Sequence, residues 1–399
     1  MQVSQVETWT KTTAHFLLAF ALCLPGWSQQ QELAPQSKPN IVAAAWQPKF
    51  WLNGELFPSY VLSINGRAST LLPQKRAGVW WIGERVPVAS VEIHPVTPNT
   101  KIRVTIQIDG FTEPSSLDAT LPEAGGHYIV SPVLRFRYSR MESLQQSVPA
   151  TVIYTVQIDG REPEQVTRDI RVRSVNDVPS GMMLPDGTYQ DLSSLFAGYV
   201  NESHPFVEKI LQEALQSKIV NSFDSYQKGP DNVLQQVFAL WYVLQQHGLH
   251  YSNIATPSAA SPDGHVASQA VRFIDQSVQS QQANCVDGSV LFASLLYKIG
   301  IKPALVVIPG HMFVGYSMDQ EGRQHQFLET TMIGADPHPK SAKESWQQFA
   351  AAVNFANQEF AQKARPGLQQ HIRGYSVIEI EKMRQAGVNA IPHCEAGCG

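Results

Sequence analysis

The sequence predicts an α+β protein in which an all-β segment precedes a segment of mixed helices and strands. Polar and apolar residues alternate at period two across residues 101–108 and 151–158, as in half-buried strands. Val233, Val237 and Leu240 are instead spaced by four and three residues, as on one face of a helix. The chain has 399 residues, of which 43% are hydrophobic, so it can bury the cores of two or three domains.

The segment 1–28 is predicted to be a secretory signal peptide. Lys11 precedes an apolar run at residues 16–24, which is far shorter than the roughly 20 residues that span a bilayer. A proline and small residues suited to cleavage follow the run, and residues 29–39 form a polar, flexible leader. We therefore expect an exported protein, periplasmic or extracellular, with no stable membrane span. An uncleaved anchor and a cytosolic start are the alternatives.

Residues 40–178 are expected to form a β-sandwich of immunoglobulin-like type. The alternating runs at 101–108 and 151–158 both end at Asp-Gly, and a further alternating run at 166–172 predicts a hairpin with the second of them. Short strands punctuated by turns, without a helical period, are typical of a sandwich. The composition shifts at residues 176–181, where we place the domain boundary.

Residues 182–365 are expected to form a second domain that begins with helices. The apolar spacing predicts helices at 205–215 and 233–244. A further amphipathic helix is predicted at 341–361, packed back on this domain. Residues 366–399 are interpreted as a C-terminal extension with a cysteine-containing tail.

The cysteine count directs attention to Cys285. Cys23 would leave with the signal peptide, and Cys394 and Cys398 are close enough in the tail to meet in an oxidising compartment. An unpaired cysteine in an exported protein is a candidate reactive group, although a buried, inert role is commoner for a lone cysteine.

Cys285 is predicted to begin a core helix. Apolar residues fill nearly every position from Val290 to Ile299, and Gly300 is a natural stop. A helix N-terminus gathers partial positive charge and unsatisfied N–H groups, which favour a thiolate over a thiol. The alternative is a cysteine that only packs above the start of the helix.

His311 and Glu329 complete a candidate catalytic triad. Strands are predicted at 311–316 and 326–331, and a hairpin loop centred on Gln320 would place His311 opposite Glu329. The histidine would accept the thiol proton, and the carboxylate would fix its tautomer and support the imidazolium. Alternatively, His311 caps a turn.

These residues resemble the transglutaminase-like branch of the papain-type cysteine enzymes, in particular uncharacterised exported bacterial members. The motifs that carry the resemblance are Ala-Asn-Cys-Val-Asp-Gly-Ser at 283–289, Pro-Gly-His at 309–311 and Leu-Glu-Thr-Thr at 328–331. The resemblance covers roughly positions 190–350, which is less than half of the chain. It implies an α+β domain whose cysteine helix packs on an antiparallel sheet, with Cys285 as nucleophile, His311 as base and Glu329 as orienting acid. The family usually has Asp at the third position, so Glu329 departs from its pattern.

An acyl-transfer enzyme also requires two donors to the tetrahedral oxyanion. The backbone N–H of Cys285 is the first candidate, as in the family. Tyr251, Gln269 and Gln282 are candidates for the second donor. Tyr251 occupies a position where the family often has an aromatic donor, although a tyrosine at the end of a helix more often serves packing.

The sequence thus predicts a cysteine acyltransferase or amide hydrolase acting on a peptide or protein substrate. The thiol would displace an amine to form a thioester, and water or another amine would then accept the acyl group. The alternative is a catalytically inactive scaffold or binding module of the cell envelope, which Glu329 in place of Asp and the unassigned second donor favour. A thiol-redox protein would require a resolving cysteine near Cys285.

Composition and spacing argue against other classes. With 30 basic and 34 acidic residues and a net charge of −4, the chain has no positive excess to hold nucleic acid. His247 and His250 have no cysteine or acidic residue beside them at zinc-ligand spacing, and no Gly-rich phosphate loop is present. We therefore expect neither a cofactor nor a metal.

Overall fold

Helices and strands occur together in the chain, and the strands form several separate sheets, so the prediction of a mixed α+β protein is confirmed. The computed structural model describes residues 46–64, 69–84, 87–184, 186–252, 265–334, 339 and 341–392. The predicted signal peptide, the leader and the tail cysteines lie outside these ranges. Within them, none of the helices combines the length and the apolar character that crossing a bilayer requires.

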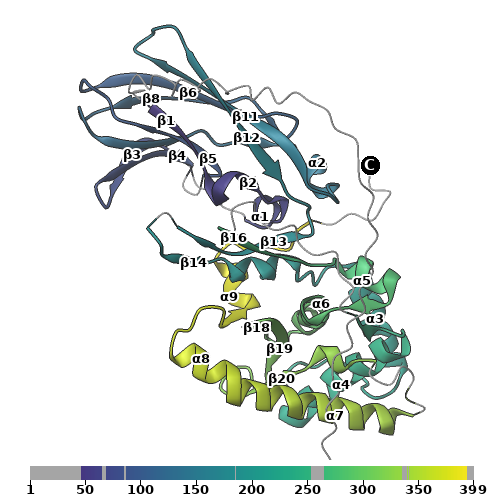
Figure 1. Cartoon of the computed structure of the whole chain (residues 1–399). Helices are drawn as coiled ribbons and strands as arrows, with labels where there is room; N and C mark the ends of the chain where they lie inside the picture. Colours follow the sequence, from purple (N-terminus) through teal and green to yellow (C-terminus); the bar gives the residue numbers. More distant parts are fainter. Residues whose placement is uncertain are drawn as a thin grey trace, which may run out of the picture. The chain divides into compact units, whose positions relative to one another are not determined.

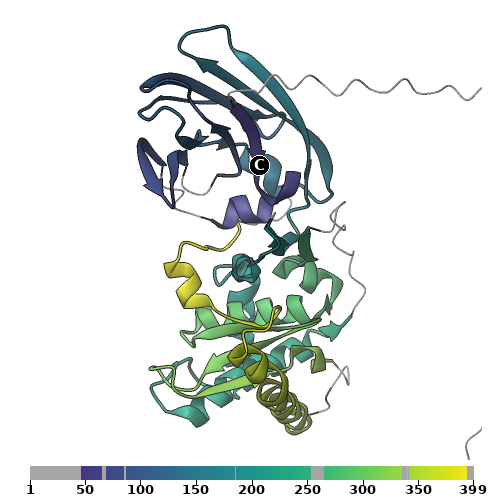
Figure 2. The same ribbon diagram turned by 60° about the vertical axis from the view of Figure 1, so that its left-hand side comes forward.

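Two five-stranded sheets make up most of the first half of the described chain, and they form two layers in Figures 1 and 2. One sheet has the strand order β1-β5-β9-β4-β3 and the other the order β2-β12-β11-β6-β8. The strands of the first sheet are β1 Trp46–Phe50, β3 Ser69–Arg76, β4 Val79–Glu84, β5 Ala89–Ile93 and β9 His127–Ser131. The strands of the second sheet are β2 Glu55–Leu56, β6 Thr100–Ile108, β8 Ser115–Leu121, β11 Val148–Ile158 and β12 Glu164–Val172.

The two sheets share an apolar core because each has one buried face. Ile102, Val104 and Ile106 of β6 are buried, and so are Val91 and Ile93 of β5. All five belong to one continuous cluster of buried side chains. The residues between them point to the opposite, more exposed faces, which is the pattern of antiparallel strands with one face in the core.

The predicted hairpin is confirmed, because β11 pairs antiparallel with β12, with Tyr154 opposite Val166. On its other edge β11 pairs with β6, with Tyr154 opposite Ile106, so the two strands that end at Asp-Gly lie side by side. The expectation of an all-β segment is wrong in one respect, since the short helices α1 (Pro58–Ser63) and α2 (Tyr138–Glu142) interrupt the strands. Neither is long enough to show a helical period, and α1 begins with a proline, which favours a first helical turn.

The boundary predicted at residues 176–181 falls on a strand rather than on a linker. This strand, β13 (Asp177–Met183), lies between β14 (Tyr189–Asp191) and β16 (Val266–Ala270) in a three-stranded sheet. Its pairing with β16 shifts register after Pro179, and an irregularity of this kind is where a sheet tolerates proline. A proline- and glycine-containing strand of this kind resembles a linker in sequence.

Arg173 ties several of these elements together. Its guanidinium is fully buried and donates hydrogen bonds to Glu55 at 3.2 Å, to Asp177 at 3.2 Å and to Ser268 at 2.9 Å. The residues Ala45–Gly399 form one compact unit. The division into two domains therefore stays a prediction from sequence.

The second half contains an antiparallel sheet of order β20-β19-β18-β21 and the longer helices. Its strands are β18 Pro303–Ile308, β19 His311–Ser317, β20 His325–Leu328 and β21 Ser376–Glu379. The helices are α3 Pro205–Gln216, α4 Pro230–Gln246, α5 Ile274–Ser280, α6 Cys285–Lys298, α7 Ala342–Glu359, α8 Arg365–Gln369 and α9 Ile380–Gln385. The helices predicted near α3, α4 and α7 are confirmed. Shorter elements are η1 Trp51–Gly54, η2 Ser193–Tyr199, η3 Thr330–Met332, the π-helical η4 Phe360–Ala364, β7 Thr112–Glu113, β10 Arg135–Phe136, β15 His250–Tyr251 and β17 Gln282–Ala283.

Helices α6 and α7 cover opposite faces of this sheet. Val306 and Phe313 are cross-strand partners whose side chains cluster with Ala356 of α7. Their neighbours in the strands, Leu305 and Val314, belong to the main core with the apolar side chains of α6. Because side chains alternate between faces along a strand, Phe313 faces α7 and its neighbour Val314 faces α6.

The predicted C-terminal extension contributes to the fold. Ile378 of β21 pairs with Leu305, so the extension supplies an edge strand of the sheet. Further along, the backbone N–H of Asn389 donates to the carbonyl of Ser63 at 2.8 Å, which returns the chain to α1.

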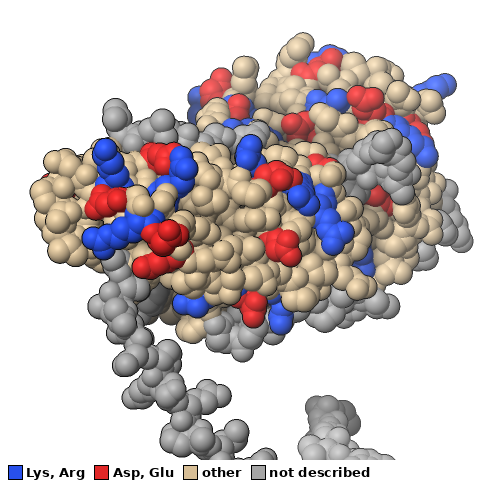
Figure 3. Space-filling model, turned by 90° about the horizontal axis from the view of Figure 1, so that it is seen from above, with Lys and Arg blue, Asp and Glu red and all other residues tan. Residues whose placement is uncertain are grey.

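Opposite charges are interspersed on the face shown in Figure 3. Among the exposed pairs, Lys75 lies 3.0 Å from Glu123, and Arg137 lies 2.9 Å from Glu113. Exposed pairs of this kind contribute about 0–1 kcal/mol each, so they add little to stability.

Candidate functional site

The turn before α6 holds Cys285 at the first position of that helix. Asn284 is the N-cap, and its side-chain oxygen accepts hydrogen bonds from the N–H groups of Val286 at 2.8 Å and Asp287 at 2.9 Å. The Asp287 carboxylate accepts in return from the Asn284 N–H at 3.1 Å, which completes a capping box. The half-buried, free thiol of Cys285 is thus fixed at the positive end of the α6 dipole.

Asp287 also anchors this turn to the segment of the chain that contains Arg272, a role that was not predicted from sequence. Its buried carboxylate accepts from the backbone N–H of Arg272 at 2.8 Å and from the Arg272 guanidinium at 3.0 Å. Burial raises the pKa of Asp287 above its usual range, and the hydrogen bonds from Arg272 and Asn284 oppose that rise. The spacing of Asn284 and Asp287, an N-cap residue followed three positions later by an acid, was the signal that could have identified this support.

His311 and Glu329 are brought together as the sequence analysis expected. His311 Nε2 donates to Glu329 Oε2 at 2.7 Å, and the Glu329 side chain is 1% exposed. The other carboxylate oxygen accepts from the backbone N–H of Thr331 at 3.0 Å and from its hydroxyl at 2.6 Å. These three hydrogen bonds leave Glu329 one orientation, and that orientation directs a negative charge at the imidazole.

The register of the hairpin differs from the predicted one by two residues. Val314 lies opposite Leu328, so the loop is centred on Glu321 rather than on Gln320. The Asp319 carboxylate accepts from two N–H groups at the far side of the loop and thereby sets this loop length. A shift of two residues keeps every side chain on its predicted face, which is why the histidine and the acid still meet.

The charge state of His311 depends on its two neighbours. Burial lowers the pKa of His311, but its interactions with Cys285 and Glu329 outweigh burial and raise it to about 10. The imidazole is therefore protonated at neutral pH. A protonated imidazole beside a thiol favours the thiolate form of that thiol.

Cys285 and His311 line one cavity of about 250 Å³. Its wall combines apolar side chains, among them Phe196, Val286 and Met312, with hydroxyl, carboxylate and amide groups from Ser180, Tyr189, Asp191, Ser193, Ser268, Gln269 and Ser376. The candidate nucleophile and base therefore open onto a small space whose wall is partly polar and partly apolar.

The candidate second donors are placed differently. Gln269 lines this cavity, and its side-chain N–H donates to the carbonyl of Ala270 at 3.0 Å. Tyr251 is 45% exposed and is not part of the cavity wall. Gln282 lies in β17 beside β15 and is also outside the wall. Of the three, Gln269 alone lies where a bound substrate could reach it.

A second carboxylate approaches His311, and the sequence analysis did not identify it. Glu359, the last residue of α7, is buried, and its Oε2 lies 3.6 Å from His311 Nε2. Its other oxygen lies 2.5 Å from the ammonium of Lys363. His311, Glu329 and Glu359 offer ligand atoms within 4.8 Å of one another. In this structure His311 Nε2 and Glu329 Oε2 engage each other through their hydrogen bond.

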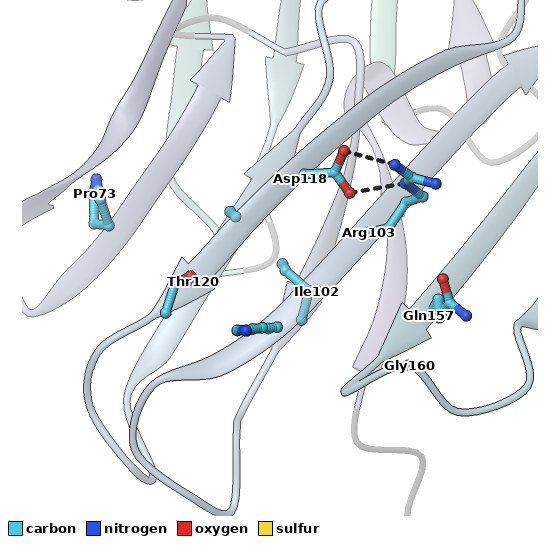
Figure 4. A pocket seen from close by; sticks show the side chains of 9 residues that line it. Pro73, Ile102, Arg103, Asp118, Thr120, Gln157 and Gly160 are labelled. Atoms are coloured by element: carbon cyan, nitrogen blue, oxygen red, sulfur yellow. Dashed lines mark hydrogen bonds and ion pairs between the residues drawn. The ribbon is translucent and has the colours of Figure 1, made fainter.

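A larger cavity, of about 510 Å³, lies on the second five-stranded sheet (Figure 4). Arg103 and Asp118 in its wall satisfy each other through two hydrogen bonds of 2.8 and 2.9 Å. Its wall contains neither cysteine nor histidine. This larger cavity therefore lacks the nucleophile and base that make the smaller cavity at Cys285 the candidate site.

Comparison with known proteins identifies no relative of this chain. No protein-family model matches the chain, and neither curated proteins nor solved structures give a significant match.

Proposed function

We propose that this protein is a transglutaminase-like cysteine enzyme that acts on peptide or protein amides through a thioester. The observation that carries the proposal is the position of His311, which hydrogen-bonds to the buried Glu329 carboxylate and lines the same cavity as Cys285. A nucleophile, a base and a group that orients the base are the parts that covalent acyl transfer requires.

In the proposed reaction, the Cys285 thiolate attacks the carbonyl carbon of an amide. The C–N bond breaks, His311 gives its proton to the leaving amine, and a thioester forms on sulfur. Water or an acceptor amine then attacks the thioester carbonyl and loses its proton to His311. The acyl group leaves as an acid or as a new amide, and the thiolate returns.

The shape of the cavity supports a side chain or a short peptide as the group that enters. Its volume of about 250 Å³ is below the roughly 300–1,000 Å³ of pockets that enclose a whole small ligand. The rest of a larger substrate would remain outside. The N–H of Cys285 and the Gln269 side chain are the proposed donors to the oxyanion, and Gln269 would exchange its hydrogen bond with Ala270 for one to the substrate.

Three further expectations from the sequence belong to this proposal. The two five-stranded sheets would form an immunoglobulin-like sandwich, the second half of the chain would be the transglutaminase-like domain, and the protein would act outside the cytoplasm. The shared core of the two sheets and the helix-on-sheet arrangement around Cys285 are consistent with the first two.

The test combines alkylation with acyl-enzyme capture. Iodoacetamide should modify Cys285 already near pH 6, where an ordinary thiol reacts slowly, and His311→Ala should slow the reaction at least tenfold. His325→Ala is the matched control, because His325 is exposed and lies on β20.

A glutamine-containing peptide should release ammonia and leave an adduct on Cys285 that hydroxylamine removes. Alkylation only above about pH 8, unaffected by His311→Ala, would refute the proposal.

The second candidate is an inactive scaffold, favoured by the engagement of Gln269 with its own neighbour and by the exposed position of Tyr251. It predicts a reactive Cys285 without any captured acyl group.

Gln269→Ala tests the proposed role of Gln269 separately. If this variant cleaves the peptide as fast as the unmodified protein, Gln269 does not stabilise the oxyanion, while the proposed thiolate chemistry of Cys285 is unaffected.

A further inference from the structure

We propose that Glu92, His94 and His127 form a binding site for a divalent transition-metal ion on the outer face of the sheet β1-β5-β9-β4-β3. This site is independent of the proposed chemistry at Cys285. It also departs from the expectation from sequence that the chain holds no metal.

Strand pairing brings the three side chains together. Ile93 of β5 lies opposite Tyr128 of β9, so the next antiparallel pair is His94 and His127. Glu92 is two residues from His94 and therefore shares its face of the strand. Ile93 and Tyr128 are buried in the core, which places the other three on the opposite, outer face.

The donor atoms converge on one point. Glu92 Oε1 lies 2.8 Å from His127 Nε2 and 3.5 Å from His94 Nε2. All three ligand atoms lie within 4.8 Å of one another. Ligands at about 2.0–2.1 Å from a tetrahedral zinc ion are about 3.3 Å apart, so these separations bracket the spacing that such an ion requires.

The orientation of His127 distinguishes a metal site from a simple ion pair. Its Nε2 is buried and, although close to Glu92, makes no hydrogen bond with any residue in the described ranges. The Nε2 atom of His127 is therefore not used in a hydrogen bond within these ranges, and a cation bound between this atom and Glu92 Oε1 would engage both.

Lys49 supports the carboxylate from behind. Its ammonium lies 2.7 Å from Glu92 Oε2, whereas the two imidazoles approach the other oxygen, Oε1. Outer partners of this kind commonly fix the orientation of a metal-bound carboxylate.

A cavity gives the ion an open side. Glu92 and His127 form part of the wall of a space of about 470 Å³, together with the aromatic side chains of Trp51 and Trp81. Three protein ligands leave at least one coordination position, which here would face this space. Two imidazoles and one carboxylate suit zinc, iron, cobalt or nickel, whereas magnesium and calcium prefer oxygen ligands alone.

The test uses the full chain, stripped with a chelator, in a Cys285→Ser, His311→Ala background that disables the other candidate ligand cluster. Titration with Zn²⁺ by calorimetry and with Co²⁺ by visible absorption should show one equivalent bound at this site, with a raised melting temperature. Glu92→Gln and His127→Ala should each weaken binding at least tenfold. His94→Ala provides a second route, because the His94 side chain is 54% exposed and its loss should not affect folding. His325→Ala is again the control.

Two results would overturn the proposal. One is a stripped protein that binds neither ion. The other is metal binding that His94→Ala and His127→Ala leave unchanged, which would place the ion elsewhere in the chain. A histidine–carboxylate cluster without metal would give the first result, together with a melting temperature that responds to pH but not to Zn²⁺.

Discussion

Glu329→Gln tests how the imidazolium of His311 is maintained. The substitution keeps the side-chain length but removes the charge that accepts from His311 Nε2 at 2.7 Å. A hydrogen bond to a charged group contributes about 1.5–3 kcal/mol. Because one pKa unit corresponds to about 1.4 kcal/mol, the pKa of His311 should fall by about 1–2 units from its value of about 10.

The assay is a pH titration of the His311 ring signals by NMR, from pH 5 to 11. Glu359→Gln is the matched control. Its carboxylate lies 3.6 Å from the same nitrogen and shares its charge with Lys363, so the fall in the pKa of His311 should be smaller. A His311 that titrates near 6.5 in the unmodified protein, or that ignores Glu329→Gln, would refute the reasoning.

The raised pKa of His311 also predicts how the stability of the protein changes with pH. Because this pKa is higher in the folded state, the interactions of His311 contribute fully to the free energy of unfolding below about pH 6.5, the pKa of an unfolded histidine. That contribution is lost as the pH rises from about 6.5 through about 10. The urea concentration at the midpoint of unfolding should therefore fall as the pH rises across this window, and it should fall less steeply in the Glu329→Gln variant.

Two further predictions concern the support of the site. Arg173→Met should destabilise the protein by about 3–5 kcal/mol in urea unfolding, because it leaves the carboxylates of Glu55 and Asp177 buried beside an apolar side chain; an unchanged midpoint would contradict this. Gly288→Ala should lower the free energy of unfolding by about 1–3 kcal/mol and slow alkylation of the Cys285 thiol. The added methyl group would lie 2.8 Å from the Thr330 hydroxyl and would push η3 away from α6. An unaltered alkylation rate would show that this contact does not position the site.

The local parts of the candidate site could be predicted from sequence. The start of α6 follows from an N-cap residue before an almost continuous apolar run, and both signals lie close to Cys285 along the chain. The meeting of His311 and Glu329 survived an error of two residues in register, because side-chain direction repeats every two residues along a strand. An error of one residue would have separated them.

The remaining parts depend on contacts between distant segments. Glu359 reaches His311 only because α7 crosses the face of the sheet that carries Phe313. The cluster of Glu92, His94 and His127 forms because β5 pairs with β9, although three other strands lie between these two along the chain. Neither local periodicity nor ligand spacing encodes such pairings, so a search for zinc-like spacing finds nothing there.

The observed register also accounts for a glutamate where the resembled family has an aspartate. Continued past Leu328, the register places Glu329 opposite Phe313 and therefore diagonal to His311. Diagonal positions in a sheet are about 7–8 Å apart, against about 4.5–5.5 Å for direct partners, so the extra methylene spans the longer distance. Glu329→Asp should therefore give a pKa of His311 between those of the unmodified protein and Glu329→Gln, since the charge remains but the hydrogen bond is lost. If Glu329→Asp instead keeps the pKa near 10, side-chain length is irrelevant and the glutamate is no adaptation to this register.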